Sequence, residues 1–196
     1  MRHAALLIAS AGLLAACHNE VNEKNASVRQ VAKAVRESGV VDDSFVRAGE
    51  WRVKGTFVDI DGPGMPAEAK AQMKQFMARM QNAAVTYCLT PEQAKHPAGR
   101  MFGGKDAGNC RYDHFKMGGG KFDIAMQCTG QGNAGSMTMQ ASGTYTPDRY
   151  QSRSTMNMQG GPRGPMTMTV SSTAERIGEC TAEDLKEAQE RLKHQG

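Results

Sequence analysis

The chain has 196 residues, which is enough for one domain with a sizeable hydrophobic core. Its formal net charge is +4, its basic and acidic residues are interspersed without a Lys/Arg run, and only 6% of its residues are aromatic. This composition argues against nucleic-acid binding, because it offers neither a basic patch nor a stacking platform for bases.

The first 16 residues are typical of an export signal and not of a folded domain. Arg2 supplies the positive start, residues 4–13 are apolar but too short for a permanent membrane span, and Leu14-Ala15-Ala16-Cys17 follows. This last segment resembles the lipobox of bacterial lipoproteins, in which cleavage precedes a cysteine that then carries several acyl chains. The resemblance implies that Cys17 is lipidated and anchors the protein stably. The alternative is a plain secretory signal that leaves Cys17 as an ordinary thiol.

The residue after the cysteine indicates a destination. It is His18 and not aspartate, which in well-studied Gram-negative systems is compatible with export to the outer membrane. We therefore expect a lipid-anchored protein on the periplasmic face of the bacterial cell envelope, in the outer membrane in preference to the inner. The membrane, reached through acylated Cys17, is its first expected partner.

Residues 17–48 are expected to hold the lipidated cysteine, a polar tether and a short helix. The segment directly after the cysteine is largely polar, which is typical of a tether. Valines at helical spacing then predict a short amphipathic helix over 27–38, which Gly39 ends. We expect this helix to pack on the domain or to form a loose stalk.

Residues 49–180 are expected to form the β-rich domain. Apolar residues alternate at period two over 49–60, which predicts a first strand. Residues 66–81 are predicted to form a helix that covers the sheet with one apolar stripe. The stripe consists of Ala69, Met73, Phe76, Met77 and Met80. A strand over 83–89 and a capped helical turn over 90–94 follow.

The clearest structural signal in the chain is a hairpin around Gly118-Gly119-Gly120. Two runs with strand-like composition flank these glycines, which supply the positive φ of a tight turn. A register symmetric about the central glycine places Phe115 opposite Asp123 and Cys110 opposite Cys128. Directly opposed Cβ atoms lie about 4.5–5.5 Å apart, which is near the span of a disulfide.

The cysteines form a consistent set. The chain has five, so lipidation of Cys17 leaves an even number, which in an oxidising compartment is typical of disulfides. The hairpin register selects Cys110–Cys128, and Cys88–Cys180 follows by elimination. No CxxC pair occurs and zinc would need more closely spaced ligands, so four structural thiols are favoured over a metal site.

Strands are predicted beyond the hairpin over 136–145, 150–159 and 166–174, and residues 181–196 are predicted to form a C-terminal helix. Folding the three strands back at their connecting turns places methionines at alternate positions on one face. This stripe consists of Met137, Met139, Met156, Met158, Met166 and Met168. The expected fold is mainly β with flanking helices (α+β), with a curved, mostly antiparallel sheet covered by the Met-rich helix.

Several segments of the β-rich part stand out together. They are Gly49-Glu50-Trp51, Val85-Thr86-Tyr87-Cys88-Leu89-Thr90-Pro91-Glu92, Met137-Thr138-Met139, Ser142-Gly143-Thr144-Tyr145 and Arg176-Ile177-Gly178-Glu179-Cys180. Over about two-thirds of the chain these segments resemble the bacterial domain of unknown function 3617 family. The resemblance implies an exported, often lipid-anchored, cysteine-paired β domain. It implies no activity, substrate or catalytic residue.

The methionine stripe is the one feature that suggests a binding site, and three interpretations stay open. Thioether sulfur suits Cu(I), and the MxM spacing places two sulfurs on one face of a strand, so the six methionines are weak metal candidates. Alternatively the face lines a pocket for an apolar ligand. The third interpretation is an adaptable core filling, because the chain is poor in Leu, Ile and Phe.

The sequence nominates no catalytic residue. Asp113 and His114 are adjacent on a strand and are expected on opposite faces, and Gly130–Gly135 fits GxGxxG but lies between two strands. No GxSxG, HExxH or P-loop motif occurs. We therefore expect a protein without enzymatic activity or cofactor, which acts as a binding or envelope-structural module. Its expected partners besides the membrane are an apolar ligand or another envelope protein.

Overall fold

The computed structural model describes residues 19–41, 45–80, 84–95, 109–130, 135–160 and 164–193. Its eight antiparallel strands form one sheet in the order β1-β4-β5-β6-β7-β8-β2-β3. The strands are β1 (Glu20–Ser27), β2 (Gly49–Asp61), β3 (Val85–Leu89), β4 (Cys110–Gly118), β5 (Lys121–Thr129), β6 (Ser136–Thr146), β7 (Arg149–Gln159) and β8 (Met166–Gly178). The helices are α1 (Val28–Ser38), α2 (Ala67–Met80), α3 (Pro91–Lys95) and α5 (Ala182–Lys193).

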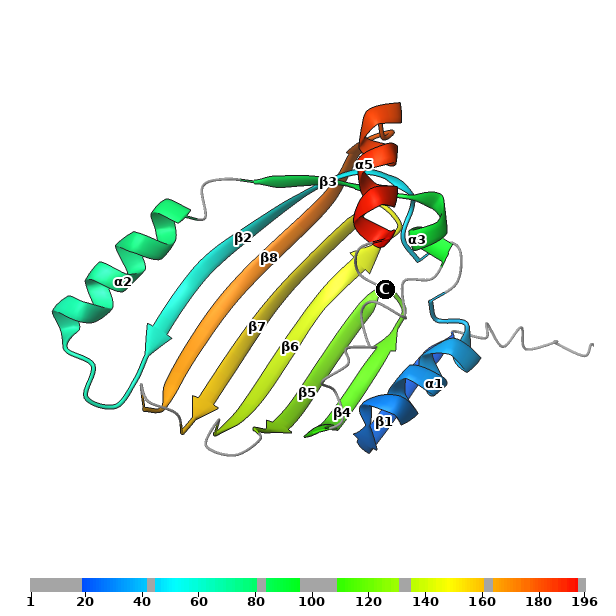
Figure 1. Cartoon of the computed structure of the whole chain (residues 1–196). Helices are drawn as coiled ribbons and strands as arrows, with labels where there is room; N and C mark the ends of the chain where they lie inside the picture. Colours follow the sequence, from blue (N-terminus) through cyan, green and yellow to red (C-terminus); the bar gives the residue numbers. More distant parts are fainter. Residues whose placement is uncertain are drawn as a thin grey trace, which may run out of the picture.

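The long strands bow along their length, but the sheet stays open between its edge strands β1 and β3 (Figure 1). The helices lie around the border of the sheet. Helix α1 packs on β1 and β4, α2 on β2, and α5 on β3. The predicted mainly β, α+β class is confirmed.

Both predicted disulfides are present. Cys110 pairs with Cys128 across β4 and β5, and the Cα atoms of the two residues are 4.0 Å apart. Cys88 of β3 bonds to Cys180, which follows β8, with a Cα–Cα distance of 5.6 Å. The first bond therefore closes the far end of the hairpin, and the second ties the short edge strand to the segment that leads into α5.

The hairpin register near the turn differs from the prediction. Gly119 and Gly120 form the turn with φ values of 56° and 74°, and a β-bulge interrupts β4 between Tyr112 and His114. As a result Phe115 lies opposite Ile124 and not opposite a charged residue. The bulge adds one residue to β4, so that the apolar side chains on either side of it meet apolar partners on one face.

The segment predicted as a polar tether is an edge strand. Residues 20–27 form β1, which pairs with β4 and buries Val21 and Ala26. These two residues are five positions apart and would face opposite sides of a regular strand. Asn25, with φ 50°, lies between them and opposite the bulge of β4, which allows both to face the core.

Helix α1 forms where it was predicted and covers the β1 end of the sheet. Ser27 caps its N-terminus in a capping box with Gln30, and Gly39 ends it with a φ of 66°. Val31 and Val35 are fully buried, as is Phe115 on β4. The hydrophobic core therefore lies between α1 and the β1–β4–β5 end of the sheet.

Helix α2 does not cover the sheet, so that part of the predicted fold is wrong. Strand β3 pairs with β2 only over residues 49–53, and α2 lies beside the rest of that edge (Figure 1). Met73 and Phe76, which belong to the predicted apolar stripe, are 41% and 57% exposed. The short connection after β2 keeps the helix beside that strand, and Lys74 holds it through an ion pair with Asp59 at 2.7 Å.

We predict that replacing the central core ring is costly and that replacing the α2 ring is not. Phe115→Ala should lower the free energy of unfolding by about 3–5 kcal/mol, because it leaves a cavity under α1. Phe76→Ala, the matched control, should change it by less than about 0.5 kcal/mol. Urea unfolding followed by circular dichroism measures both. Similar losses in the two variants would contradict this assignment of the core.

The attachment of α2 should depend on pH. The hydrogen bond from Lys74 lowers the pKa of Asp59 below its ordinary value of 3.8. A lowered carboxyl pKa contributes stability that is present above the unfolded-state pKa and is lost as the pH falls through the folded-state pKa. We predict that amide protection factors in α2 decrease between pH 6 and pH 2.5 more than those in α1. Asp59→Asn should show low α2 protection at both pH values, and full protection in this variant would refute the explanation.

Candidate functional site

The predicted methionine register is confirmed. Met139 pairs with Met156, which pairs with Met168, and Met137 pairs with Met158, which pairs with Met166. Strand β5 extends the first row, because Met126 lies opposite Met139. Directly opposed residues share one face with Cβ atoms about 4.5–5.5 Å apart, so the seven thioethers form two adjacent rows across four strands.

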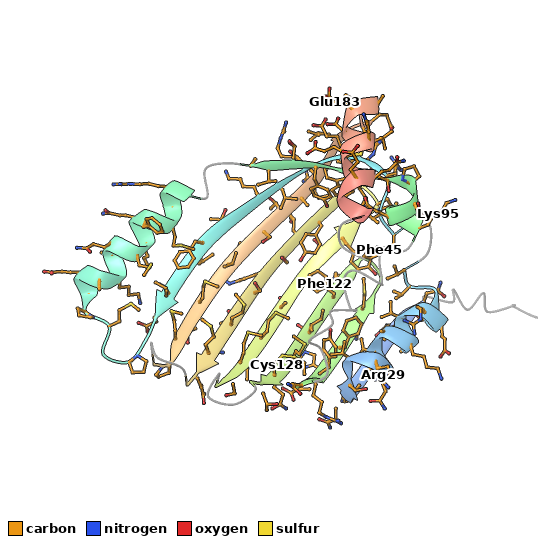
Figure 2. All side chains as sticks on the ribbon, viewed as in Figure 1. Arg29, Phe45, Lys95, Phe122, Cys128 and Glu183 are labelled. Atoms are coloured by element: carbon orange, nitrogen blue, oxygen red, sulfur yellow. A yellow bond between two sulfur atoms is a disulfide. The ribbon has the colours of Figure 1, made fainter. Side chains whose placement is uncertain are left out.

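These methionines are half-buried, and of the seven only Met126 packs against the core cluster under α1. The residues that alternate with them on β6 are exposed polar residues on the opposite face, such as Thr138 and Gln140. Figure 2 shows side chains standing on the strands of the Met-bearing face between Phe122 and Cys128. The interpretation of the stripe as a core covered by the Met-rich helix is wrong in its cover, because α2 packs on β2 and not over the stripe.

Toward the opposite ends of the strands, the Met-bearing face carries small residues, Ser152 and Ser154 among them, and then aromatic rings. Phe122 stacks on Tyr150 with a ring centroid distance of 5.7 Å and parallel planes. Gly143 lies between these two strands, and a Cβ atom on it would be 2.6 Å from the Phe122 ring. Tyr145 is the last member of this face on β6, and its ring contacts Phe45 at 4.9 Å.

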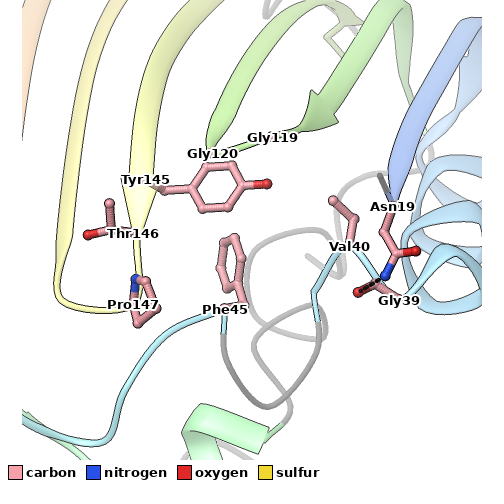
Figure 3. Close-up of a pocket in the computed structure, with 9 residues that line it drawn as sticks. All are labelled: Asn19, Gly39, Val40, Phe45, Gly119, Gly120, Tyr145, Thr146 and Pro147. Atoms are coloured by element: carbon pink, nitrogen blue, oxygen red, sulfur yellow. Dashed lines mark hydrogen bonds between the residues drawn. The ribbon is translucent and has the colours of Figure 1, made fainter. Parts of the chain in front are cut away.

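A pocket of about 340 Å³ opens at this end of the sheet (Figure 3). Its apolar lining comes from Val40, Phe45, Tyr145 and Pro147, which belong to three separate segments of the chain. Asn19, the first described residue, is at its border and donates a hydrogen bond to the Gly39 carbonyl at 3.4 Å. The pocket therefore lies between Asn19 and Tyr145, the last residue of this face on β6.

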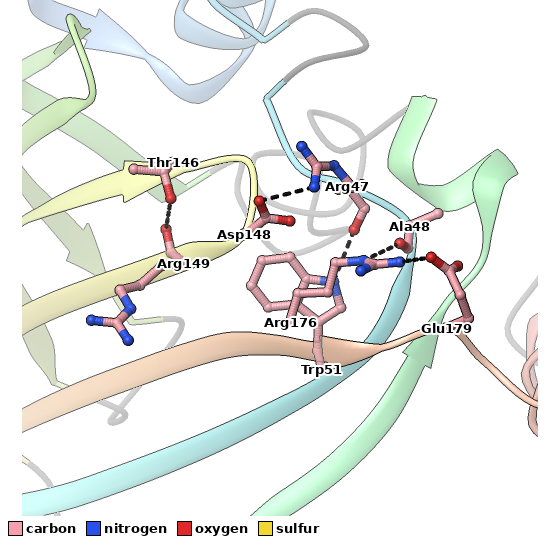
Figure 4. Close-up of polar contacts among 8 residues, drawn as sticks. All are labelled: Arg47, Ala48, Trp51, Thr146, Asp148, Arg149, Arg176 and Glu179. Carbon is pink, nitrogen blue, oxygen red and sulfur yellow. Dashed lines mark hydrogen bonds and ion pairs between the residues drawn. The ribbon is translucent and has the colours of Figure 1, made fainter.

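A set of polar contacts holds the segment that carries Phe45 (Figure 4). The Arg47 amide donates to the Pro147 carbonyl at 2.8 Å, and the Arg47 guanidinium contacts Asp148 at 3.1 Å. The Trp51 indole donates to the Arg47 carbonyl at 2.9 Å. These bonds fix one wall of the pocket against the β6–β7 turn.

The Asp113–His114 pair does not form an acid–base site. The bulge in β4 places both side chains on the polar face, which corrects the expectation of opposite faces. His114 pairs with Asp123, whereas Asp113 accepts a hydrogen bond from Gln127 at 2.6 Å. Within the ranges that the structure describes, no group of three His, Cys, Asp or Glu residues is placed to hold a metal ion.

Cys17 and the glycine motif are the remaining features singled out in the sequence. Cys17 lies outside the described residues, as does the middle of the glycine motif, 131–134. The Gly130 amide donates to the Gly135 carbonyl, so the motif connects two antiparallel strands as expected. Among the described helices, none combines the length and hydrophobicity needed to span a membrane.

The fold and the site together define an open antiparallel sheet protein with half-buried methionine rows on one face. The chain belongs to the family of proteins of unknown function designated DUF3617, whose model matches residues 46–180. This match contains the Met-bearing face but neither β1 nor α1. Neither the curated proteins nor the solved structures yielded a match.

Two glycines on this face test its packing. A Cβ atom on Gly143 would also be 2.0 Å from the Gln151 carbonyl oxygen, whereas one on Gly55 would have nothing within 4 Å. We predict that Gly143→Ala lowers the free energy of unfolding by about 1–3 kcal/mol and disrupts the Phe122–Tyr150 stack. Gly55→Ala should be neutral or slightly stabilising. Thermal unfolding and near-UV circular dichroism measure both effects, and equal stabilities would argue against close packing at Gly143.

Proposed function

We propose that this protein is a lipid-anchored, non-catalytic protein of the bacterial cell envelope that binds an apolar ligand on its Met-lined face. One observation carries the proposal: two rows of half-buried methionines lie side by side across β5, β6, β7 and β8, and none of the described helices packs on these strands. A contiguous apolar surface that is not fully buried is often a site of interaction with a ligand or a partner.

Methionine is suited to such a surface. Its unbranched thioether side chain adapts to irregular apolar partners, which favours binding of flexible ligands over recognition of one rigid shape. Each ligand methylene group that the surface removes from water contributes about 0.8 kcal/mol. For a chain-like ligand that covers both rows, the summed free energy of burying its methylene groups would offset the entropy lost on association.

The envelope location rests on two features of the chain. The first 16 residues and the lipobox-like segment ending at Cys17 support export and acylation. The two disulfides support an oxidising compartment, because such bonds persist outside the cytosol. The absence of a motif for catalysis in the sequence favours a binding role.

The test uses mature protein exported to the periplasm with Cys17→Ser, which removes the anchor and keeps β1. Native mass spectrometry detects an apolar ligand that copurifies, and fluorescence of N-phenyl-1-naphthylamine measures the affinity for an apolar probe. Met139→Gln combined with Met156→Gln should weaken probe binding at least tenfold, because a buried amide without partners costs about 1–3 kcal/mol.

The matched control is Ser142→Gln combined with Thr144→Gln, on the exposed polar face of β6. These substitutions introduce the same side chain on the same strand and should leave probe binding unchanged. Equal affinities in the two double variants would contradict the proposal, as would wild-type protein that binds no probe and carries no ligand.

Binding of Cu(I) is the second candidate, and the cross-strand methionine pairs favour it. Met139 beside Met156 and Met137 beside Met158 place soft thioether donors next to one another. Replacing these four residues with leucine separates the two candidates, because leucine keeps the apolar surface and removes the sulfur. Cu(I) binding would be lost in this variant, whereas binding of the apolar probe would persist.

A further inference from the structure

Six methionines on β6, β7 and β8 place their thioether groups side by side on one face of the sheet. Each of them is half-buried, and none belongs to the core cluster under α1 or to the residues packed against it. None of the described helices packs on these three strands. These six sheet methionines are Met137, Met139, Met156, Met158, Met166 and Met168.

Met117 on β4 lies in a different environment. It is only 2% exposed, and it belongs to the core cluster that also contains Phe115 and Val31. The described chain therefore has thioethers of two kinds. Those on the sheet face can be reached by a small solute from water, whereas that of Met117 is enclosed. Because the oxidation of a thioether depends on its exposure, the two kinds should react at different rates.

The chemistry of an exposed thioether is oxygen transfer. Its sulfur attacks one oxygen of a hydroperoxide, the O–O bond breaks, and a proton moves from the transferred oxygen to the departing one. The sulfur loses two electrons and becomes a sulfoxide, while the peroxide is reduced, so that hydrogen peroxide leaves as water. The reaction needs no cofactor, and it converts an apolar side chain into a polar one.

We propose that the six sheet methionines are an oxidation site, where hydroperoxides form sulfoxides, and that this modification closes the Met-lined face to apolar ligands. The second step rests on the proposed function. A sulfoxide oxygen accepts hydrogen bonds from water while the face is open and loses them beneath an apolar ligand. Burial of a polar group without a partner is unfavourable, so the sulfoxides oppose the binding that the thioethers favour.

Oxidation at this site should leave the fold intact. The largest fully buried side chains are Phe115, Val31 and Val35, which lie in the core cluster under α1 and away from the six sheet methionines. Sulfoxides on the half-buried face keep their contact with water. Oxidation of Met117 would instead place a polar group inside the core, which is costly.

The test uses the mature Cys17→Ser protein treated with hydrogen peroxide. Peptide mapping by mass spectrometry locates the added oxygen atoms, and fluorescence of N-phenyl-1-naphthylamine measures binding. We expect Met117 to react at least about tenfold more slowly than the six sheet methionines. Probe affinity should fall about tenfold or more, with an unchanged far-UV circular dichroism spectrum.

Three outcomes would overturn the inference. The first is oxidation of Met117 as fast as that of the six sheet methionines. The second is an unchanged probe affinity after the six have been oxidised. The third is a loss of affinity that appears only together with a loss of the circular dichroism spectrum, since the effect would then come from unfolding.

A matched pair of variants assigns the effect to the sheet, each variant being compared with its own untreated affinity. Replacing Met137, Met139, Met156 and Met158 with leucine removes four sulfur atoms from the face, so peroxide should lower affinity less than about threefold. Met73→Leu combined with Met77→Leu removes two thioethers from α2 and should leave the full loss. Equal losses in the two variants would overturn the assignment, and the wild-type peptide map decides it if the first variant does not fold.

The untreated protein separates this inference from the proposed function. Untreated protein that binds the probe, with an affinity that oxidation of the six sheet methionines does not change, retains the proposed function and loses the inference. Untreated protein that binds no probe loses both.

Discussion

The structure depends on the contact between α1 and the sheet. An antiparallel sheet with one apolar face needs a cover, and here α1 covers only its β1–β4 end, where Val31, Val35 and Phe115 are fully buried. On the part of this face away from α1, the methionines are half-buried. The domain thus places its largest fully buried side chains under α1 and leaves the half-buried methionine rows as the surface proposed for binding.

The family match covers the strands of the Met-bearing face but not α1. It begins at residue 46, after β1 and α1, and contains the strands that carry both methionine rows. Residues 20–38 add an edge strand and a helix to β4, and they also connect the domain to the proposed anchor. The same short segment therefore completes the core and leads back toward the proposed anchor.

The strand pattern could be predicted wherever local turns determine it. The short turn at Pro147 and Asp148 sets the β6–β7 register, so the methionine rows followed from counting residues. The edge strand β1 was missed because its two buried residues are out of phase across Asn25. The hairpin bulge and the place of α2 depend on partners distant in sequence, namely β1 opposite the bulge and Asp59 for Lys74. The pocket could not be predicted from the sequence either, because its walls come from segments that are distant in sequence.

The most direct test of the central claim observes the methionines themselves. Protein with ¹³C-labelled methionine methyl groups gives one NMR signal for each residue, which can be followed as a short-chain phosphatidylcholine is added below its micelle concentration. We expect shifts at Met126, Met139, Met156 and Met168 and none at Met73 on α2. Unchanged signals on the sheet, or shifts confined to α2, would contradict a binding role for the Met-lined face.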